Sequence, residues 1–483
     1  MPKQYYDVAI IGGGILGASI AYFISASSSN SVILLEREKE IAVHASSRNT
    51  GKVHAPFLYD PINKGLFARA AYLGFQMLRE YCDIFALPFK QDGVLSVATY
   101  DKGIDILHKY LDWGISNGLQ GDELYLIDNN RISKIEPNVR CLSAIYCSRD
   151  ASVDYGSIAR HLVHNASELG CTVAKGMNAV NVKKTNKRLE VQIIPDYSNF
   201  RLIVDSRKTD RLENKSNIKD SLRPDLFEAG TNLRTSGFKI YVNYLINAAG
   251  GNALNIAHQM NIAKKYNNLY FRGEYWLAPP EYQRVTKLSI YSVPMFPEFP
   301  FLDPHWVVRY DGSNEIGPNA VPVLGPYGYD WRSNLRRFTP KVLELAKNSG
   351  ILKHMLNSRF IYLLGRELLS SVSKTAMINR VRKFLPILNP SLFTQRGTSG
   401  IRSLLVDNNG KFLPEMIEFR DESSLHILNY NSPGATGALP ISASIVSRLI
   451  KDGLLQSNRE KQIRRKDQWN IHNIDSKLSG KSI

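Results

Sequence analysis

Cysteine is scarce in this sequence. The 483 residues include four cysteines, and no two of them are spaced as Cys-x-x-Cys. Thiolate ligands for zinc or iron–sulfur clusters and thiol redox centres usually occur in such pairs. We therefore expect no metal site, and a reducing cytoplasm is the simplest compartment.

Long hydrophobic runs without charge are also scarce. One run, Val8 to Ile24, has a length compatible with a signal peptide or a membrane span. The glycines Gly12 to Gly14 interrupt this run and Asp7 precedes it, which favours a strand, a tight turn and a helix. The sequence shows no other candidate span, so we expect any membrane contact to be peripheral.

Acidic residues are outnumbered by basic ones. The chain has 61 Lys and Arg against 44 Asp and Glu, a net charge of +17, which favours an anionic partner such as a carboxylate, a phosphate or an acidic membrane. Residues 331–385 hold twelve Lys or Arg and two acids among apolar residues at helical spacing, which predicts a basic helical insertion. Aromatic residues do not alternate with these charges as in an RNA-binding motif, so we expect no nucleic acid.

Hydrophobic patterns predict two globular domains in a chain of this length. Short apolar runs at 7–11 and 31–36 are typical of buried parallel strands, and residues 15–24 have the length of a packed helix. Further helices are expected at 62–85 and 155–169, and further strands at 94–98, 171–182, 189–194 and 241–249. We interpret the polar stretch 195–237 as an insertion without a chemical role, and we expect the tail after Asp452 to be frayed.

The motif Gly12-x-Gly14-x-x-Gly17 stands between the first predicted strand and helix, and Glu36 ends the next strand nineteen residues later. Glycines let the backbone turn tightly and approach a pyrophosphate, which the helix N-terminus attracts, and the acid accepts hydrogen bonds from ribose hydroxyls. A glycine triplet alone can be a structural turn. With strand, helix and acid in register, the motif predicts a dinucleotide site.

FAD and NAD share this motif, so a second observation has to separate them. The sequence has no second Gly-x-Gly-x-x-Gly, and nothing indicates a separate nicotinamide domain that would reduce a flavin. Residues 44–54 (His-Ala-Ser-Ser-Arg-Asn-Thr-Gly-Lys-Val-His) bring small hydroxyl and amide side chains directly after the acid. Such a loop suits a phosphate and a flavin ring, so we predict FAD that is reduced by the substrate itself.

Several blocks of the sequence resemble the D-amino-acid oxidase superfamily of FAD enzymes, and more closely its L-2-hydroxyglutarate dehydrogenase branch. The resemblance runs from residue 7 to about residue 445. Its blocks, in order, are Leu87-Pro88-Phe89 with Gly93, Val153-Asp154-Tyr155, Phe271 to Tyr275, Phe299 to Leu302, His305, Arg309 to Gly312, Gly317 to Ala320, Gly400-Ile401-Arg402 and Asn431 to Thr436.

The resemblance implies oxidation of an L-2-hydroxy acid to the 2-oxo acid, with electrons passed to a quinone or another acceptor. It also implies a Rossmann-like FAD-binding domain (α/β) of residues 1–92, 151–256 and 396–450. The substrate domain (α+β) is expected to be a discontinuous antiparallel sheet of residues 93–150 and 257–395, and residues 451–483 form the tail. The implied FAD contacts are Gly12, Gly14, Gly17, Glu36, Arg37, Ser46, Ser47, Asn49, Thr50, Val180, Ala249, Gly250, Gly400, Ser432, Pro433, Gly434, Ala435 and Thr436.

Other members of the superfamily remain alternatives. Malate:quinone oxidoreductases are similar in the His305 to Gly317 block, and the basic stretch with Tyr362 to Arg366 looks more like theirs. Glycerol-3-phosphate dehydrogenases are similar at Arg48-Asn49, and amine or amino-acid oxidases at the FAD motif. Asp303-Pro304 replaces the small residue and valine of the hydroxyglutarate branch, which leaves the length of the substrate open.

Oxidation of a hydroxy acid needs a base for the hydroxyl proton and cations for the carboxylates. Histidine is a suitable base at neutral pH, and His305 and then His54 are the candidates because they stand in the two blocks that the resemblance brings to the flavin. Guanidinium groups bind carboxylates through paired hydrogen bonds, and the blocks that carry the resemblance make Arg309 and Arg402 the candidate cations, with Lys52 as a further one beside the flavin. Each of these side chains could instead have only a packing or surface role. We expect a cytoplasmic enzyme that contacts the inner face of the cell membrane peripherally, where a quinone could reach it.

Overall fold

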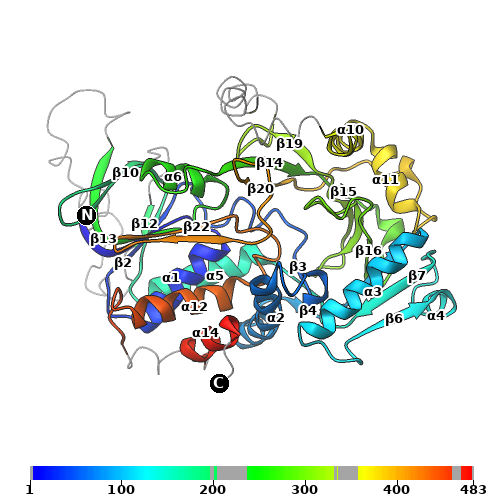
Figure 1. Cartoon of the computed structure of the whole chain (residues 1–483), viewed down its shortest axis with the longest axis horizontal. Helices are drawn as coiled ribbons and strands as arrows, with labels where there is room; N and C mark the ends of the chain where they lie inside the picture. The colour runs from blue at the N-terminus through cyan, green and yellow to red at the C-terminus, as the bar shows by residue number, and fades with distance from the viewer. Residues whose placement is uncertain are drawn as a thin grey trace, which may run out of the picture.

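The computed structural model describes residues 4–195, 201–203, 237–330, 334, 357–458 and 469–480. Figure 1 shows two parts side by side, one built on a large sheet at the left and the other on a second sheet at the right. Small sheets lie in the chain segments that connect these parts. In this arrangement, segments far apart in the sequence share one sheet.

The large sheet has a parallel centre. Strands β1 (Tyr5–Ile11), β2 (Val32–Glu36), β9 (Thr172–Lys175), β13 (Phe238–Asn247) and β22 (Ser424–Leu428) pair in parallel, and β22 lies beside β13. The antiparallel strands β10 (Met177–Lys184), β11 (Leu189–Pro195), β12 (Arg201–Ile203) and β21 (Ile417–Arg420) extend its edges. Central strands are buried on both faces, which explains why their sequences read as continuous apolar runs.

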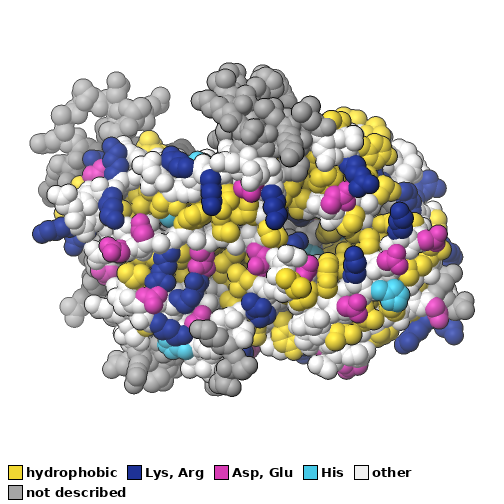
Figure 2. Space-filling view, viewed as in Figure 1, with side chains coloured by type: hydrophobic (Ala, Val, Ile, Leu, Met, Phe, Trp, Pro, Cys, Tyr) yellow, Lys and Arg dark blue, Asp and Glu magenta, His cyan; other side chains and the backbone are white. Residues whose placement is uncertain are grey.

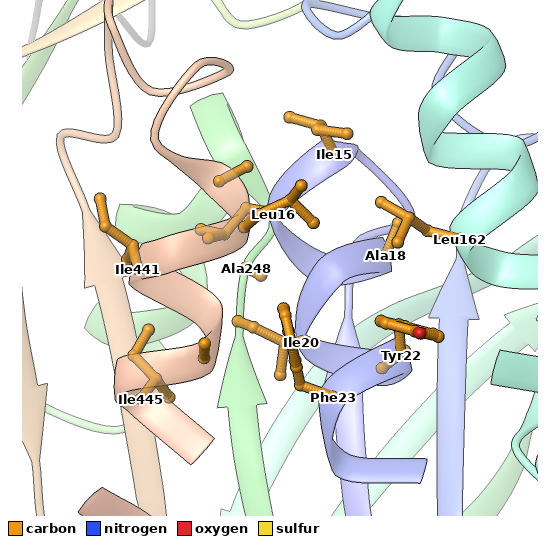
Figure 3. Close-up of a cluster of buried hydrophobic side chains, with 14 of the residues drawn as sticks. Ile15, Leu16, Ala18, Ile20, Tyr22, Phe23, Leu162, Ala248, Ile441 and Ile445 are labelled. Carbon is orange, nitrogen blue, oxygen red and sulfur yellow. The ribbon is translucent and has the colours of Figure 1, made fainter. Parts of the chain in front are cut away.

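Helices cover one face of this sheet. Figure 1 shows α1 (Ile15–Ser27), α5 (Tyr155–Glu168) and α12 (Ala438–Lys451) together below the strands, whereas α6 (Ala253–Gln259) lies above them. The close-up in Figure 3 places α1 between the other two helices, with Leu162 on one side and Ile441 and Ile445 on the other. All thirteen residues of α1 are buried, so no polar face distinguishes this helix. The uncharged run Val8 to Ile24, whose length is compatible with a membrane span, therefore consists of the end of β1, the glycine turn and most of the core helix α1.

The second sheet carries the strand that begins with His305. Its order is β15-β18-β17-β16-β5-β7-β6, and the pairing is antiparallel except between β16 and β5. The strands are β5 (Val94–Ala98), β6 (Leu124–Asp128), β7 (Ser143–Cys147), β15 (Trp276–Leu277), β16 (Ser289–Ser292), β17 (His305–Val308) and β18 (Asn314–Gly317). Helix α3 (Asp101–Ser116) packs on β5, β6 and β7, and α4 (Asn129–Ile135) follows β6. The predicted antiparallel sheet is therefore mixed at one strand pair.

Two small sheets connect the larger ones. One contains β14 (Asn267–Gly273) between β19 (Val321–Val323) and β20 (Gly400–Val406), and the other contains β8 (Ala151–Val153) between β3 (Lys52–Val53) and β4 (Phe89–Lys90). Helix α2 (Gly65–Phe85) packs against α12. We propose that the domain boundaries expected above follow the two large sheets, because their strands come from the alternating chain segments that the resemblance implied.

The structure describes only part of the two predicted insertions, and it contradicts the prediction for part of the tail. Most of 195–237 and of 331–356 lies outside the described residues, and the described end of the basic insertion forms α10 (Ser358–Val372) and α11 (Lys374–Arg382). The prediction of a frayed tail was wrong for residues 469–480, where α14 (Ile471–Ser479) packs on α12 and α2. Ile471, Ile474 and Leu478 lie on one helical face and are buried there.

Candidate active site

A cavity of about 260 Å³ is lined by segments from both large sheets and from the small sheets. The N-terminus of α1, the loop 45–50 after β2, strands β3, β14 and β20, the start of β17 and the turn 431–436 all contribute. Predicted residues that line it are Gly14, Ser46, Asn49, Thr50, Lys52, His54, Gly250, His305, Gly400, Arg402, Ser432, Pro433, Gly434, Ala435 and Thr436. The fold thus brings most of the predicted site residues to one cavity.

The glycine turn between β1 and α1 leaves no room for side chains. Gly12 has φ +108°, in a region that favours glycine, and a Cβ on Gly17 would lie 1.9 Å from the carbonyl oxygen of Gly12. The backbone N–H of Ile15 donates to Ser46 Oγ at 2.9 Å, so the loop after β2 lies against the helix N-terminus. These features fit a phosphate group that approaches the backbone at the positive end of the helix.

Gly17→Ala should weaken FAD binding, because the new methyl group forces the turn to open. Overpacking of this kind costs about 1–3 kcal/mol, which corresponds to a roughly ten- to hundredfold loss of FAD affinity. Titration of the apoprotein with FAD, followed by flavin fluorescence, measures this effect. Gly121→Ala is a matched control, because a Cβ there meets no atom within 4 Å. Equal FAD affinity for both variants would contradict the assignment of the turn.

Glu36 lies at the end of β2 and is bound by backbone groups. Its Oε2 accepts from the N–H of Gly13 at 2.7 Å, and its Oε1 accepts from the N–H of Glu38 at 2.7 Å. Burial raises the pKa of this carboxyl above its usual value, although both hydrogen bonds oppose the shift. Neighbouring Arg37 pairs with Glu38 and lies over the ring of Tyr327. Glu36 therefore holds the glycine turn, and its contact with a ribose stays a prediction.

Some of the predicted FAD contacts do not line the cavity. These residues are Gly12, Gly17, Glu36, Arg37, Ser47, Val180 and Ala249. Gly12 and Gly17 form the turn behind the cavity, and the carbonyl of Val180 accepts from Gln259 at 3.0 Å. Their roles toward FAD remain predictions.

Two histidines lie beside the cavity, and burial keeps both neutral. His305 is 3% exposed, and its Nδ1 lies 3.1 Å from the carbonyl oxygen of Asp303. Because a carbonyl only accepts, Nδ1 carries the hydrogen and Nε2 is left with a lone pair. His54 Nδ1 lies 3.9 Å from Asp150 Oδ2, and the ring of Tyr291 packs against His305 at 4.3 Å. Burial lowers the pKa of His305 to about 4 and that of His54 to about 3.

Of the two candidate arginines, only Arg402 lines the cavity. Its Nη1 donates to the carbonyl of Pro300 at 3.0 Å, and no carboxylate of the described residues forms an ion pair with it. Arg309 was predicted to bind the substrate, but the structure does not bring it to the cavity. Its guanidinium forms an ion pair with Glu315 across the β17–β18 pair and donates to the carbonyl of Asn49 at 3.1 Å.

Lys52 lines the cavity but is already paired with carboxylates. Its Nζ lies 2.8 Å from Asp92 Oδ1, 2.9 Å from Asp150 Oδ1 and 3.0 Å from Ser152 Oγ, and the side chain is fully buried. Burial raises the pKa of Asp150 to about 7, although the ammonium of Lys52 opposes this shift. Lys52 therefore neutralises buried acids, which reduces its value as a free cation for the substrate.

The sequence reasoning assigned no role to several cavity residues. These are Tyr155, Phe271, Tyr275, Phe301, Leu302 and Asn319. All six stand in the blocks that carry the family resemblance, so their position in those blocks was the available signal. Asp150 was missed because it lies one residue before a short strand and shows its role only through its contacts with Lys52 and His54.

The comparisons with known proteins agree with this geometry. Residues 7–207 match the DAO family, described as FAD dependent oxidoreductase. The chain is 29% identical over 453 residues to human mitochondrial L-2-hydroxyglutarate dehydrogenase, covering 92% of this chain and 88% of that protein. It is 28% identical over 449 residues to L-2-hydroxyglutarate dehydrogenase of Indibacter alkaliphilus, covering 92% of this chain and 99% of that protein.

A solved structure shares the fold. The L-alpha-glycerophosphate oxidase of Mycoplasma pneumoniae with FAD bound superposes with a TM-score of 0.65 at 17% identity, covering 94% of this chain and 97% of that one. In the described part of this chain, no helix combines the length and the hydrophobicity needed to cross a membrane. When bound, FAD supplies a two-electron acceptor. Residues 7–207 thus match the DAO family, and the protein is an FAD-dependent oxidoreductase.

Proposed function

We propose that the protein oxidises an L-2-hydroxy dicarboxylic acid, with L-2-hydroxyglutarate as the first candidate, to the 2-oxo acid. The observation that carries this proposal is one cavity lined by Arg402, a partly buried arginine that pairs with no carboxylate of the described residues, and by two neutral histidines, His54 and His305. Relatives of that name match more than nine-tenths of the chain, which supports the same substrate.

The residues divide the reaction between them. Loss of two electrons and two protons converts the carbinol to a ketone, so the protein has to accept the hydroxyl proton, and bound FAD would supply the acceptor for the carbon-bound hydrogen and its electron pair. Nε2 of His305 accepts the hydroxyl proton, because its lone pair is free while Nδ1–H is bound to Asp303. Arg402 binds the carboxylate beside the carbinol through paired hydrogen bonds.

Anaerobic mixing of the FAD-loaded protein with a panel of acids tests the proposal. Flavin absorbance should bleach with L-2-hydroxyglutarate and not with its D enantiomer, glycerol 3-phosphate or amino acids. L-malate is one methylene shorter, and such a difference changes kcat/KM by about 10–200-fold in an apolar pocket. Faster bleaching by L-malate would make the protein a malate dehydrogenase of the same family. Bleaching only by glycerol 3-phosphate or an amine would overturn the proposal.

The rate of flavin reduction should not change near neutral pH and should fall in acid. A base acts in its neutral form, and the pKa of His305 lies at about 4 because the ring is buried. The rate should therefore fall tenfold for each unit of pH below about 4. Stopped-flow reduction across a pH series, with circular dichroism to exclude unfolding, measures the profile. A midpoint between pH 6 and 7 would indicate a more hydrated histidine or another base.

We also propose that the electron acceptor is a quinone reached at an anionic membrane surface. Figure 2 shows hydrophobic side chains gathered over α10, at the upper right of the view. Apolar residues on this helix that are exposed by 46–82% are Ile361, Tyr362, Leu368, Leu369 and Val372. Arg359 at its start, Arg382 at the end of α11 and Lys383 directly after it are also exposed. An apolar helix face beside cations is typical of a helix that lies in a membrane interface.

Binding to anionic vesicles should depend on this face and on salt. Co-sedimentation with vesicles of phosphatidylcholine and phosphatidylglycerol should decrease at high salt, because salt screens charge attraction. Leu369→Asp should reduce the bound fraction several-fold. Ile115→Asp on α3 is the matched control, because Ile115 and Leu369 are 56% and 55% exposed. Absence of binding, or binding indifferent to salt, would overturn the membrane proposal and leave the proposed oxidation untouched.

A further inference from the structure

One short segment before β17 contacts both proposed substrate-binding groups. The carbonyl of Pro300 accepts from Arg402 Nη1 at 3.0 Å, and the carbonyl of Asp303 accepts from His305 Nδ1 at 3.1 Å. Between these two carbonyls, Phe301 and Leu302 line the cavity. The position of residues 300–303 therefore determines where the Arg402 guanidinium, the His305 imidazole and part of the cavity wall lie.

The side chain of Asp303 fixes this segment from the side away from the cavity. Its carboxylate forms ion pairs with Arg366 of α10, at 3.3 Å, and with Arg380 of α11, and it accepts from the N–H of Met295 at 2.9 Å. Burial alone would raise the pKa of Asp303, but Arg380 and Arg366 outweigh it and the pKa lies below its usual value. Asp303 is thus ionised at neutral pH and joins two helices to the segment.

The helices α10 and α11 are connected to the cavity wall by a second set of contacts, through Ala320. Arg380 Nη1 also pairs with Glu367 Oε1 at 2.9 Å, and Glu367 Oε2 accepts from the N–H of Ala320 at 2.9 Å. Ala320 lines the cavity. The ion pairs between α10, α11 and the loops are therefore not a remote surface feature, because their backbone partners form the cavity wall.

We propose that Asp303 is a positioning residue for the reaction: its carboxylate, held by Arg366 and Arg380, fixes the segment whose carbonyls orient Arg402 and His305. The inference rests on the proposed function, since it assumes that these two side chains meet the substrate. Pro304 restricts the backbone directly after the anchor, so the position of Asp303 passes to His305 with little freedom. A displacement of about 1 Å in a reacting group can cost a hundredfold in rate. Asp303 acts without touching the substrate.

Asp303→Asn tests this role, because the amide keeps the shape and removes the charge. FAD content and melting temperature are measured first, and stopped-flow reduction of the FAD-saturated variant then gives the rate constant and the Kd for L-2-hydroxyglutarate. We expect the rate constant to fall roughly ten- to hundredfold and the Kd to rise several-fold, with FAD content unchanged. Glu298→Gln is the matched control. It removes another ion pair to α10, Glu298–Arg359 at 3.3 Å, which is exposed and touches neither carbonyl.

A second measurement separates positioning from general damage. In a His305→Ala background, Asp303→Asn should reduce the rate constant much less than in the wild type, because the part of the effect that acts through His305 is already lost and only the part through Arg402 remains. An equal loss in both backgrounds, or a wild-type rate for Asp303→Asn alone, would overturn the inference. A wild-type rate for His305→Ala would instead refute the proposed base, and with it the action of Asp303 through His305.

Discussion

His305→Ala is expected to slow flavin reduction by the cognate hydroxy acid roughly a hundredfold or more, the usual range for losing a general base. FAD should remain bound, because the glycine turn and Glu36 belong to the large sheet, whereas His305 begins β17 of the second sheet. The alanine has no ring nitrogen to accept the hydroxyl proton. In the wild type, Nδ1–H of His305 is bound to the carbonyl of Asp303, which leaves the lone pair on Nε2 to accept that proton. The binding of the substrate carboxylate by Arg402 should be almost unchanged.

Stopped-flow reduction of the FAD-saturated variant measures this effect per folded molecule. If His305 only packs against Tyr291, the variant should lose stability and keep its rate. His54→Ala is the matched comparison, because it removes the other neutral imidazole of the cavity. A near wild-type rate for His305→Ala with a slow His54→Ala would assign the base to His54 and its partner Asp150.

Arg402→Met should reduce kcat/KM for the hydroxy acid roughly a hundred- to a thousandfold. Removal of one partner of a buried, hydrogen-bonded charge pair costs about 2–5 kcal/mol, because the other charge is left buried and unpaired. In the free protein, Arg402 has no carboxylate partner among the described residues, so its loss leaves no protein carboxylate unpaired. Stability should therefore change less than substrate affinity.

Arg309→Met is the matched control for Arg402→Met. It removes the partner of the buried Glu315 carboxylate outside the cavity, so we expect a loss of stability with little change in substrate affinity. Binding of the 2-oxo acid to the oxidised protein, followed by perturbation of the flavin spectrum, measures affinity without turnover. A larger loss of affinity for Arg309→Met than for Arg402→Met would show that the cavity rearranges on binding.

The sequence was sufficient for the parts of the protein that depend on neighbours along the chain. The strand, turn and helix around Gly12, the acid at the end of β2 and the strand β5 at Val94–Ala98 all follow from short patterns, because backbone geometry and apolar runs are local properties. The fold class followed from the family resemblance of the blocks, and the cofactor followed from the glycine motif and the loop 44–54. The tail was predicted wrongly because its apolar face is short and gains its stability only by packing on α12 and α2.

Only the tertiary structure decided which of the candidate side chains are available for the substrate. Arg309 and Arg402 are the same residue type in equally specific blocks, yet the β17–β18 register places Glu315 beside Arg309, while Arg402 lines the cavity and pairs with no carboxylate in the part of the chain that the structure describes. Lys52 meets Asp92 and Asp150, which lie 40 and 98 residues further along the chain. Whether a charged side chain is paired depends on which opposite charges folding brings within a few ångströms of it. These distances join residues that are far apart in the sequence, so they cannot be deduced from local sequence patterns.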